Sequence, residues 1–157
     1  MMGSMPKAIG NFTGLIYLNL AQNNFIDSIP EPIKKLRLLT TLNLGANNLI
    51  GKILEGIVTL NHLQHLFLND NHFTSTIPKG IEKLHSLIKL SLNSNSIFGS
   101  IPESIDDLVS LQQLNISKQS RGTNPRSYLP ICGIINVRFV QKQVEWKYSF
   151  RSWYLET

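Results

Sequence analysis

The chain has 157 residues with a formal net charge of +5, a length that suggests one domain. It contains no run of 18 apolar residues, so no segment is predicted to span a membrane. The apolar stretch at 15–20 is too short for the core of a signal peptide. The single cysteine, Cys132, excludes an internal disulfide.

The charge is distributed unevenly along the sequence. Residues 1–117 contain eight Lys and Arg and eight Asp and Glu, and are therefore neutral. Residues 118–157 contain seven basic residues and two acidic ones, together with both tryptophans. This shift in composition predicts a boundary near residue 118.

A motif recurs every 24 residues along most of the chain. An asparagine marks each turn at Asn23, Asn47, Asn71 and Asn95, and Gln119 takes the fifth position. An L-x-x-L-x-L pattern precedes each of them, beginning at Leu15, Leu39, Leu63, Leu87 and Leu111. This period and this leucine spacing indicate a leucine-rich-repeat solenoid.

The leucine spacing predicts short parallel strands. Residues two apart point to the same side of a strand, so Leu18 and Leu20 face inward and Tyr17 and Asn19 face outward. We expect a right-handed α/β solenoid with one parallel sheet on its concave face and short helical turns opposite. Its strands should be centred near Asn19, Asn43, Phe67, Ser91 and Asn115.

The repeated asparagine is predicted to form a structural ladder along the solenoid. Its side chain has both a donor and an acceptor, which can satisfy backbone groups where the chain leaves the sheet. Asn23, Asn47, Asn71 and Asn95 are all expected to point inward. Gln119 predicts that the fifth turn is imperfect.

The second half of each turn resembles the G-x-I-P-x-x-I/L phrase of plant-type leucine-rich repeats. Pro30, Pro78 and Pro102 keep the proline of this phrase, whereas Leu54 departs from it. Proline favours an extended segment before a tight helical turn. The resemblance is to ectodomain segments of plant receptor-like kinases and receptor-like proteins. Such ectodomains usually carry paired cysteines at both ends, and these pairs are missing here.

The sequence predicts a solenoid over residues 3–119 followed by a tail at 120–157. A partial turn at 3–14 precedes 24-residue turns that start near 15, 39, 63, 87 and 111. In the tail, apolar and polar residues alternate from Val144 to Phe150, which is typical of a half-buried strand. The tail is therefore either a makeshift C-terminal cap or an unrelated extension. The partial turn at 3–14 suggests that the chain is a piece of a longer solenoid.

The outward columns of the concave sheet are the predicted binding surface. Most of these side chains are short and polar, and Phe67 is the exception. An exposed aromatic is a frequent binding hot spot, although Phe67 could equally pack on its neighbours. The candidate binding residues are Tyr17, Asn19, Thr41, Asn43, His65, Phe67, Asn69, Asp70, Lys89, Ser91 and Asn93.

No catalytic motif, metal-ligand set or cofactor motif is found in the sequence. The four histidines, His62, His65, His72 and His85, should diverge from one another, which disfavours a metal site. The basic aromatic tail lacks a nucleic-acid-binding motif. Asn11 and Asn115 lie in N-x-S/T triplets and are candidate glycosylation sites if the chain is exported.

The resemblance implies a non-catalytic recognition module, at the cell surface or outside the cell, in signalling or defence. Its expected partner is a protein or peptide on the concave face, with a co-receptor ectodomain as a further candidate and nucleic acid disfavoured. One alternative is an inhibitor resembling polygalacturonase-inhibiting proteins. Another is a fragment without independent activity.

Overall fold

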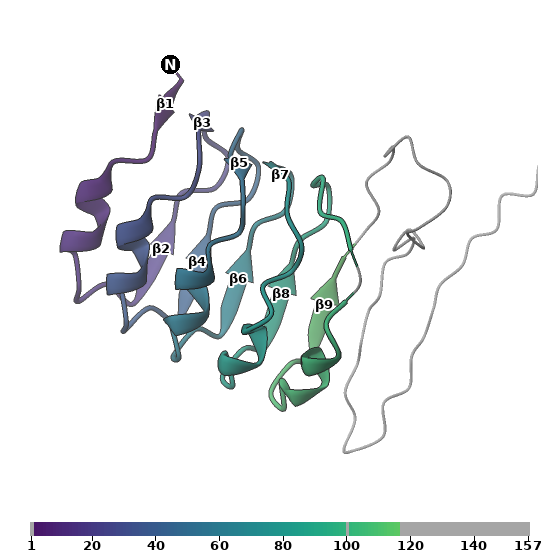
Figure 1. Ribbon diagram of the computed structural model, residues 1–157. Coiled ribbons are helices and arrows are strands. Elements are labelled where there is room, and N and C mark those ends of the chain that lie inside the picture. The colour runs from purple at the N-terminus through teal and green to yellow at the C-terminus, as the bar shows by residue number, and fades with distance from the viewer. Residues whose placement is uncertain (1, 100, 117–157) are drawn as a thin grey trace, which may run out of the picture.

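The computed structural model describes residues 2–99 and 101–116 (Figure 1). The predicted tail at 120–157 and the predicted imperfection at Gln119 lie outside these residues. The strands are β1 (Gly3–Ser4), β2 (Tyr17–Asn19), β3 (Phe25–Ile26), β4 (Thr41–Asn43), β5 (Ile50–Gly51), β6 (His65–Phe67), β7 (His72–Phe73), β8 (Lys89–Ser91) and β9 (Gln113–Asn115). The 3-10 helices are η1 (Lys7–Asn11), η2 (Glu31–Lys35), η3 (Glu55–Thr59), η4 (Ile81–Lys83) and η5 (Glu103–Asp107).

Five strands form one parallel sheet in the order β2-β4-β6-β8-β9, which confirms the predicted solenoid. Each pairs with its neighbour at a shift of one 24-residue turn, as Leu18 does with Leu42. Hydrogen bonds between these turns extend beyond the three-residue strands, from the Ile16 carbonyl to the Gln22 amide. This longer ladder is centred on Asn19, where the sequence places the middle of the strand.

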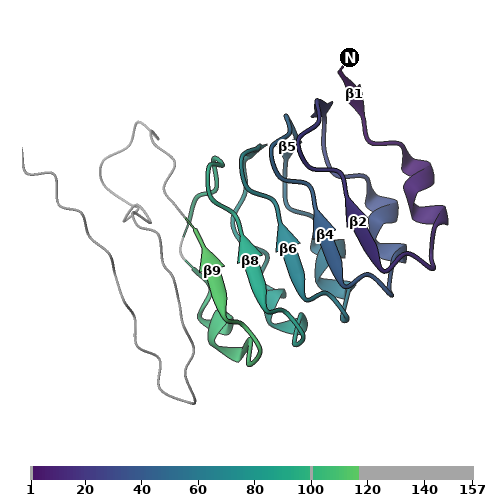
Figure 2. The same cartoon turned by 180° about the vertical axis from the view of Figure 1, so that it is seen from behind.

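The 3-10 helices line the side of the solenoid opposite the sheet (Figures 1 and 2). Pro30 and Pro102 precede η2 and η5 with ψ angles of 136° and 139°. Leu54 precedes η3 with a ψ of 136°, although it lacks the ring that restricts proline. The packing of the turns therefore enforces the extended geometry even where the sequence departs from the repeat.

The core lies between the sheet and the helices. Most inward leucines of the strands and most isoleucines of the second halves of the turns are almost completely buried, and so is Phe73 of β7. Leu20 and Ile101 are partly buried and pack against this core. The turns share this core because a single turn cannot bury its own apolar face. Its most buried members include Ile33, Leu36, Leu42, Leu44, Leu60, Leu66, Phe73, Leu84 and Leu111.

Asn71 shows how the asparagines connect successive turns. Its Nδ2 donates to the Leu44 carbonyl of the preceding turn at 2.9 Å, and to carbonyls of its own turn. Its Oδ1 accepts the backbone N–H of Leu49 at 3.0 Å. Asn47 and Asn95 form the equivalent bonds to the turns before them.

Asn23 differs from the other three asparagines in its exposure. Its Nδ2 donates to the carbonyls of Leu20 and Ala21 within its own turn, but the side chain is exposed. The bridging bonds of Asn47, Asn71 and Asn95 each reach the turn before, and among the described residues no turn supplies the matching carbonyl to Asn23. Asn23 therefore has the predicted direction but is exposed, because no described turn covers it.

The residue before each asparagine has a left-handed backbone conformation. Gln22, Ala46, Asp70 and Ser94 have φ angles between 53° and 56°. This region is sterically unfavourable for residues with a Cβ and is readily adopted by glycine. The turn geometry, repeated at one position, holds these residues in that conformation.

We predict that Asn71→Ala lowers the free energy of unfolding by about 1–3 kcal/mol, because it leaves buried backbone groups unpaired. Asn23→Ala is the matched control, since it changes the same side chain at an exposed position. Its effect should be clearly smaller in urea denaturation. Equal losses for the two variants would contradict the bridging role of the buried asparagines.

We predict that Ala46→Gly stabilises the protein by roughly 0.5–1 kcal/mol, because relief of the left-handed strain exceeds the entropic cost of glycine. Ala8→Gly, in η1 and without a positive φ, should instead destabilise it. Thermal melts of both variants measure this difference. A lower melting temperature for Ala46→Gly would show that the turn is not strained.

Candidate functional site

The candidate site is the outer face of the five-stranded sheet, which we call the concave face. Alternate residues of β4, β6 and β8 project from it, and the strand register places them side by side. His65 pairs with Thr41 of one neighbouring strand and with Lys89 of the other. The middle three strands therefore bring candidate residues from three turns together.

Phe67 is the centre of a small cluster on this face. Its ring stacks on that of His65, with a centroid distance of 6.3 Å and an interplanar angle of 3°. The Nζ of Lys89 lies 5.4 Å from the centroid of the Phe67 ring, which is a cation–π geometry. His65 Nδ1 lies 3.4 Å from the Thr41 Oγ1. We call His65, Phe67 and Lys89 the aromatic–lysine cluster.

The members of this cluster are half-buried. Phe67 thus points out of the sheet, as the pattern predicts, and also packs on its neighbours. Lys89 forms no ion pair with any residue that the structure describes. The cluster therefore presents an apolar ring surface next to a cation that has no carboxylate partner among the described residues.

The asparagines around the cluster are occupied with bonds to their neighbours. Asn43 Oδ1 accepts the N–H of Gly45 at 3.0 Å, and Asn69 Nδ2 donates to the Asp70 carboxylate at 2.6 Å. Asn93 Oδ1 accepts a hydrogen bond from Ser91 Oγ at 3.1 Å. These bonds fix the surface beside the cluster and reduce its capacity to bind a ligand.

Ser91 is a correction to the predicted binding surface. It is only 5% exposed, although the alternation directs it outward. Its strand neighbours are Phe67 and Asn115, and Asn115 Nδ2 donates to the Ser91 Oγ at 3.4 Å. Larger side chains on both sides therefore cover this small residue.

Tyr17 and Asn19 lie apart from the cluster, on the edge strand β2. Tyr17 is 59% exposed, and its hydroxyl accepts a hydrogen bond from Asn19 Nδ2 at 3.3 Å. This edge pair is therefore separate from the cluster at the middle of the sheet.

The two candidate glycosylation residues lie in different environments. Asn11 is exposed at the end of η1, whereas Asn115 is half-buried on the concave face. Within residues 2–99 and 101–116, no group of three His, Cys, Asp or Glu residues could hold a metal ion.

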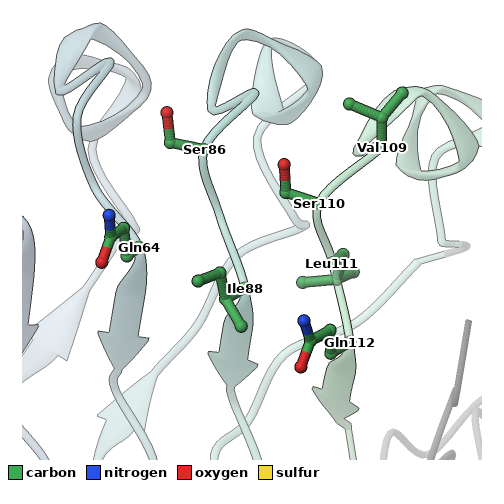
Figure 3. Close-up of a pocket in the computed structure, with 7 residues that line it drawn as sticks. All are labelled: Gln64, Ser86, Ile88, Val109, Ser110, Leu111 and Gln112. Atoms are coloured by element: carbon green, nitrogen blue, oxygen red, sulfur yellow. The ribbon is translucent and has the colours of Figure 1, made fainter.

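Sequence reasoning missed a depression at the edge of the sheet (Figure 3). It has a volume of about 500 Å³ and lies where the chain enters β6, β8 and β9. We call it the rim depression. Gln64, Ile88 and Gln112 share one repeat position, directly before β6, β8 and β9, and this column of the sequence could have revealed the depression. Its lining residues are Gln64, Ser86, Ile88, Val109, Ser110, Leu111 and Gln112.

A stack of turns with one continuous parallel sheet defines a solenoid repeat protein. The model of the family described as the leucine-rich repeat region matches residues 3–129, ten residues beyond the predicted boundary at 119. The chain therefore belongs to the leucine-rich repeat family. No curated protein matches it in sequence.

Solved plant structures share this fold. The plant peptide hormone receptor RGFR1, in complex with RGF2, is 30% identical with a TM-score of 0.73, and the match covers 74% of this chain and 19% of the receptor. The Arabidopsis receptor kinase HAESA, in complex with the peptide hormone IDA and the co-receptor SERK1, is 35% identical with a TM-score of 0.68. That match covers 74% of this chain and 20% of HAESA. A plant ice-binding protein is 26% identical with a TM-score of 0.68, over 74% of this chain and 37% of that protein.

We predict that Phe67→Ala costs no more than about 1 kcal/mol of stability, because it removes a half-buried ring and its two ring contacts. It should destabilise the protein less than Asn71→Ala does. Urea denaturation of the two variants measures the order. A larger loss for Phe67→Ala would mean that the ring is a core element and not a surface group.

Proposed function

We propose that this chain is a non-catalytic recognition module that binds a peptide or protein ligand on its concave face. The observation that carries the proposal is the aromatic–lysine cluster at the middle of the sheet. An aromatic ring at the centre of a surface is a typical binding hot spot, and Lys89 offers a charge to the ligand. Half-buried positions also hold these side chains in place before a ligand arrives.

The chain spans about a fifth of the length of the two hormone receptors that it resembles. Those receptors are solved with peptide hormones, and HAESA also with a co-receptor. By analogy, we propose a peptide ligand, a co-receptor ectodomain as a second partner, and a place at the cell surface or outside the cell. Within the described residues, no helix has the length and apolar character that a membrane crossing requires.

The proposal can be tested with a library of synthetic peptides that correspond to secreted plant peptide hormones. Binding of each peptide to the immobilised full chain would be measured by interferometry. A peptide that binds saturably would then be compared across variants. Failure of the entire library to bind, or chemical turnover of a bound peptide, would contradict the proposal.

We predict that Phe67→Ala/Lys89→Ala weakens the binding of such a peptide at least tenfold, which is a loss of about 1.4 kcal/mol in binding free energy. Thermal melting should show that this variant is folded. Phe98→Ala/Lys52→Ala is the matched control. It also removes one aromatic ring and one lysine, but both are exposed residues outside the five-stranded sheet. If the control weakens binding as much as the test variant does, the ligand does not depend on the concave face.

A further inference from the structure

The rim depression is formed by three successive turns of the solenoid. Figure 3 shows Gln64, the pair Ser86 and Ile88, and the Val109–Gln112 segment on three neighbouring rungs. Its volume is about 500 Å³, and it is open to solvent, because Gln64, Val109 and Gln112 are all exposed. The backbone beneath it is fixed, because the Gln64 carbonyl accepts the N–H groups of both Ile88 and Lys89.

The polar side chains of the rim depression are free to bind a ligand. Gln64, Ser86, Ser110 and Gln112 make no side-chain hydrogen bond to any residue in the described part of the chain. Each of these groups can both donate and accept. This differs from the neighbouring concave face, where the asparagine side chains already bond to one another and to the backbone.

The lining of the rim depression selects a neutral ligand. No charged residue and no aromatic ring belongs to it. The apolar surface comes from Ile88, which is half-buried, and from Val109, which is 83% exposed. The primary amide of glutamine has the same donor and acceptor pair as a peptide bond, so the two can bond reciprocally. A sugar would find no ring on which its apolar face could stack.

The spacing of the glutamines fits an extended chain. Gln64 and Gln112 lie two strands apart in the sheet order. Neighbouring strands are separated by about 4.8 Å, so the two positions are about 9.6 Å apart. An extended chain rises about 3.3 Å per residue, so three residues cover that distance.

We propose that the rim depression binds the main chain of an uncharged, extended stretch of about three residues in a peptide ligand. Gln64 and Ile88 directly precede His65 and Lys89, so the depression adjoins the aromatic–lysine cluster. Both features lie on the rungs of β6 and β8, so one peptide of sufficient length can contact both. This inference rests on the proposed function and adds a second subsite to the same ligand path.

The test uses isotope-labelled full chain and N-acetyl-trialanine-N′-methylamide as the probe. Nuclear magnetic resonance follows the side-chain amide signals of Gln64 and Gln112 during the titration. We expect saturable shifts of both signals, and at least tenfold weaker binding in Gln64→Ala/Gln112→Ala. Gln22→Ala is the control, because Gln22 is an exposed glutamine outside the depression.

A second variant, Gln64→Glu/Gln112→Glu, keeps the length of both side chains and removes their donors. This variant should also bind the probe more weakly. The dispersion of its backbone amide signals should show that its fold is intact. Phe67→Ala/Lys89→Ala should bind the trialanine probe like the unmodified chain, because neither residue lines the depression. Probe binding by this cluster variant distinguishes an error in the proposed depression site from an error in the proposed function.

Three results would overturn the proposal. One is the absence of saturable shifts at Gln64 and Gln112. Another is an equal response of the Gln22 amide, which would show non-specific contact. The third is stronger binding of maltotriose than of the blocked trialanine, which would assign the depression to a neutral saccharide.

Discussion

The hydrogen bonds of the buried asparagine amides set the distance between successive turns. Asn47, Asn71 and Asn95 each donate to a leucine carbonyl of the preceding turn at 2.9 Å. Each also accepts a backbone N–H of that turn through Oδ1. These bonds bring the turns close enough to share one core, which no single turn could form. The pairing of neighbouring strands keeps the same step of 24 residues and fixes the columns of the concave face.

The fixed register also brings polar side chains of the concave face within hydrogen-bonding distance of one another. Because side chains at one repeat position stand beside one another, polar residues in neighbouring columns and rungs satisfy each other before any ligand is present. Asn69 bonds Asp70, and Ser91 bonds both Asn93 and Asn115. The aromatic–lysine cluster and the rim depression have fewer such bonds, which is why both proposals place the ligand there. Burial and hydrogen bonding, in addition to side-chain direction, therefore determine which residues of the sheet are candidates for binding.

The inward half of the structure could be predicted from the sequence because it depends on periodicity. The leucine columns determine which residues are buried, and the 24-residue step determines the register of Leu18 with Leu42. The outward half depends on the size of neighbouring side chains, which periodicity does not contain. Ser91 is covered for that reason, although its direction was predicted correctly. The rim depression was missed because it is formed by residues just outside the strands, where alternation carries no information.

The difference between inward residues, which follow the repeat, and outward residues, which do not, also bears on function. Two hormone receptors and an ice-binding protein share this fold with the chain at identities from 26% to 35%. Proteins that bind such different targets on one scaffold must differ in the residues that point away from the core. The repeat geometry persists even at Leu54, where the backbone keeps the extended form without its proline. We therefore propose that specificity in this chain depends on a few outward positions, with Phe67, Lys89 and the glutamines at the rim as the candidates.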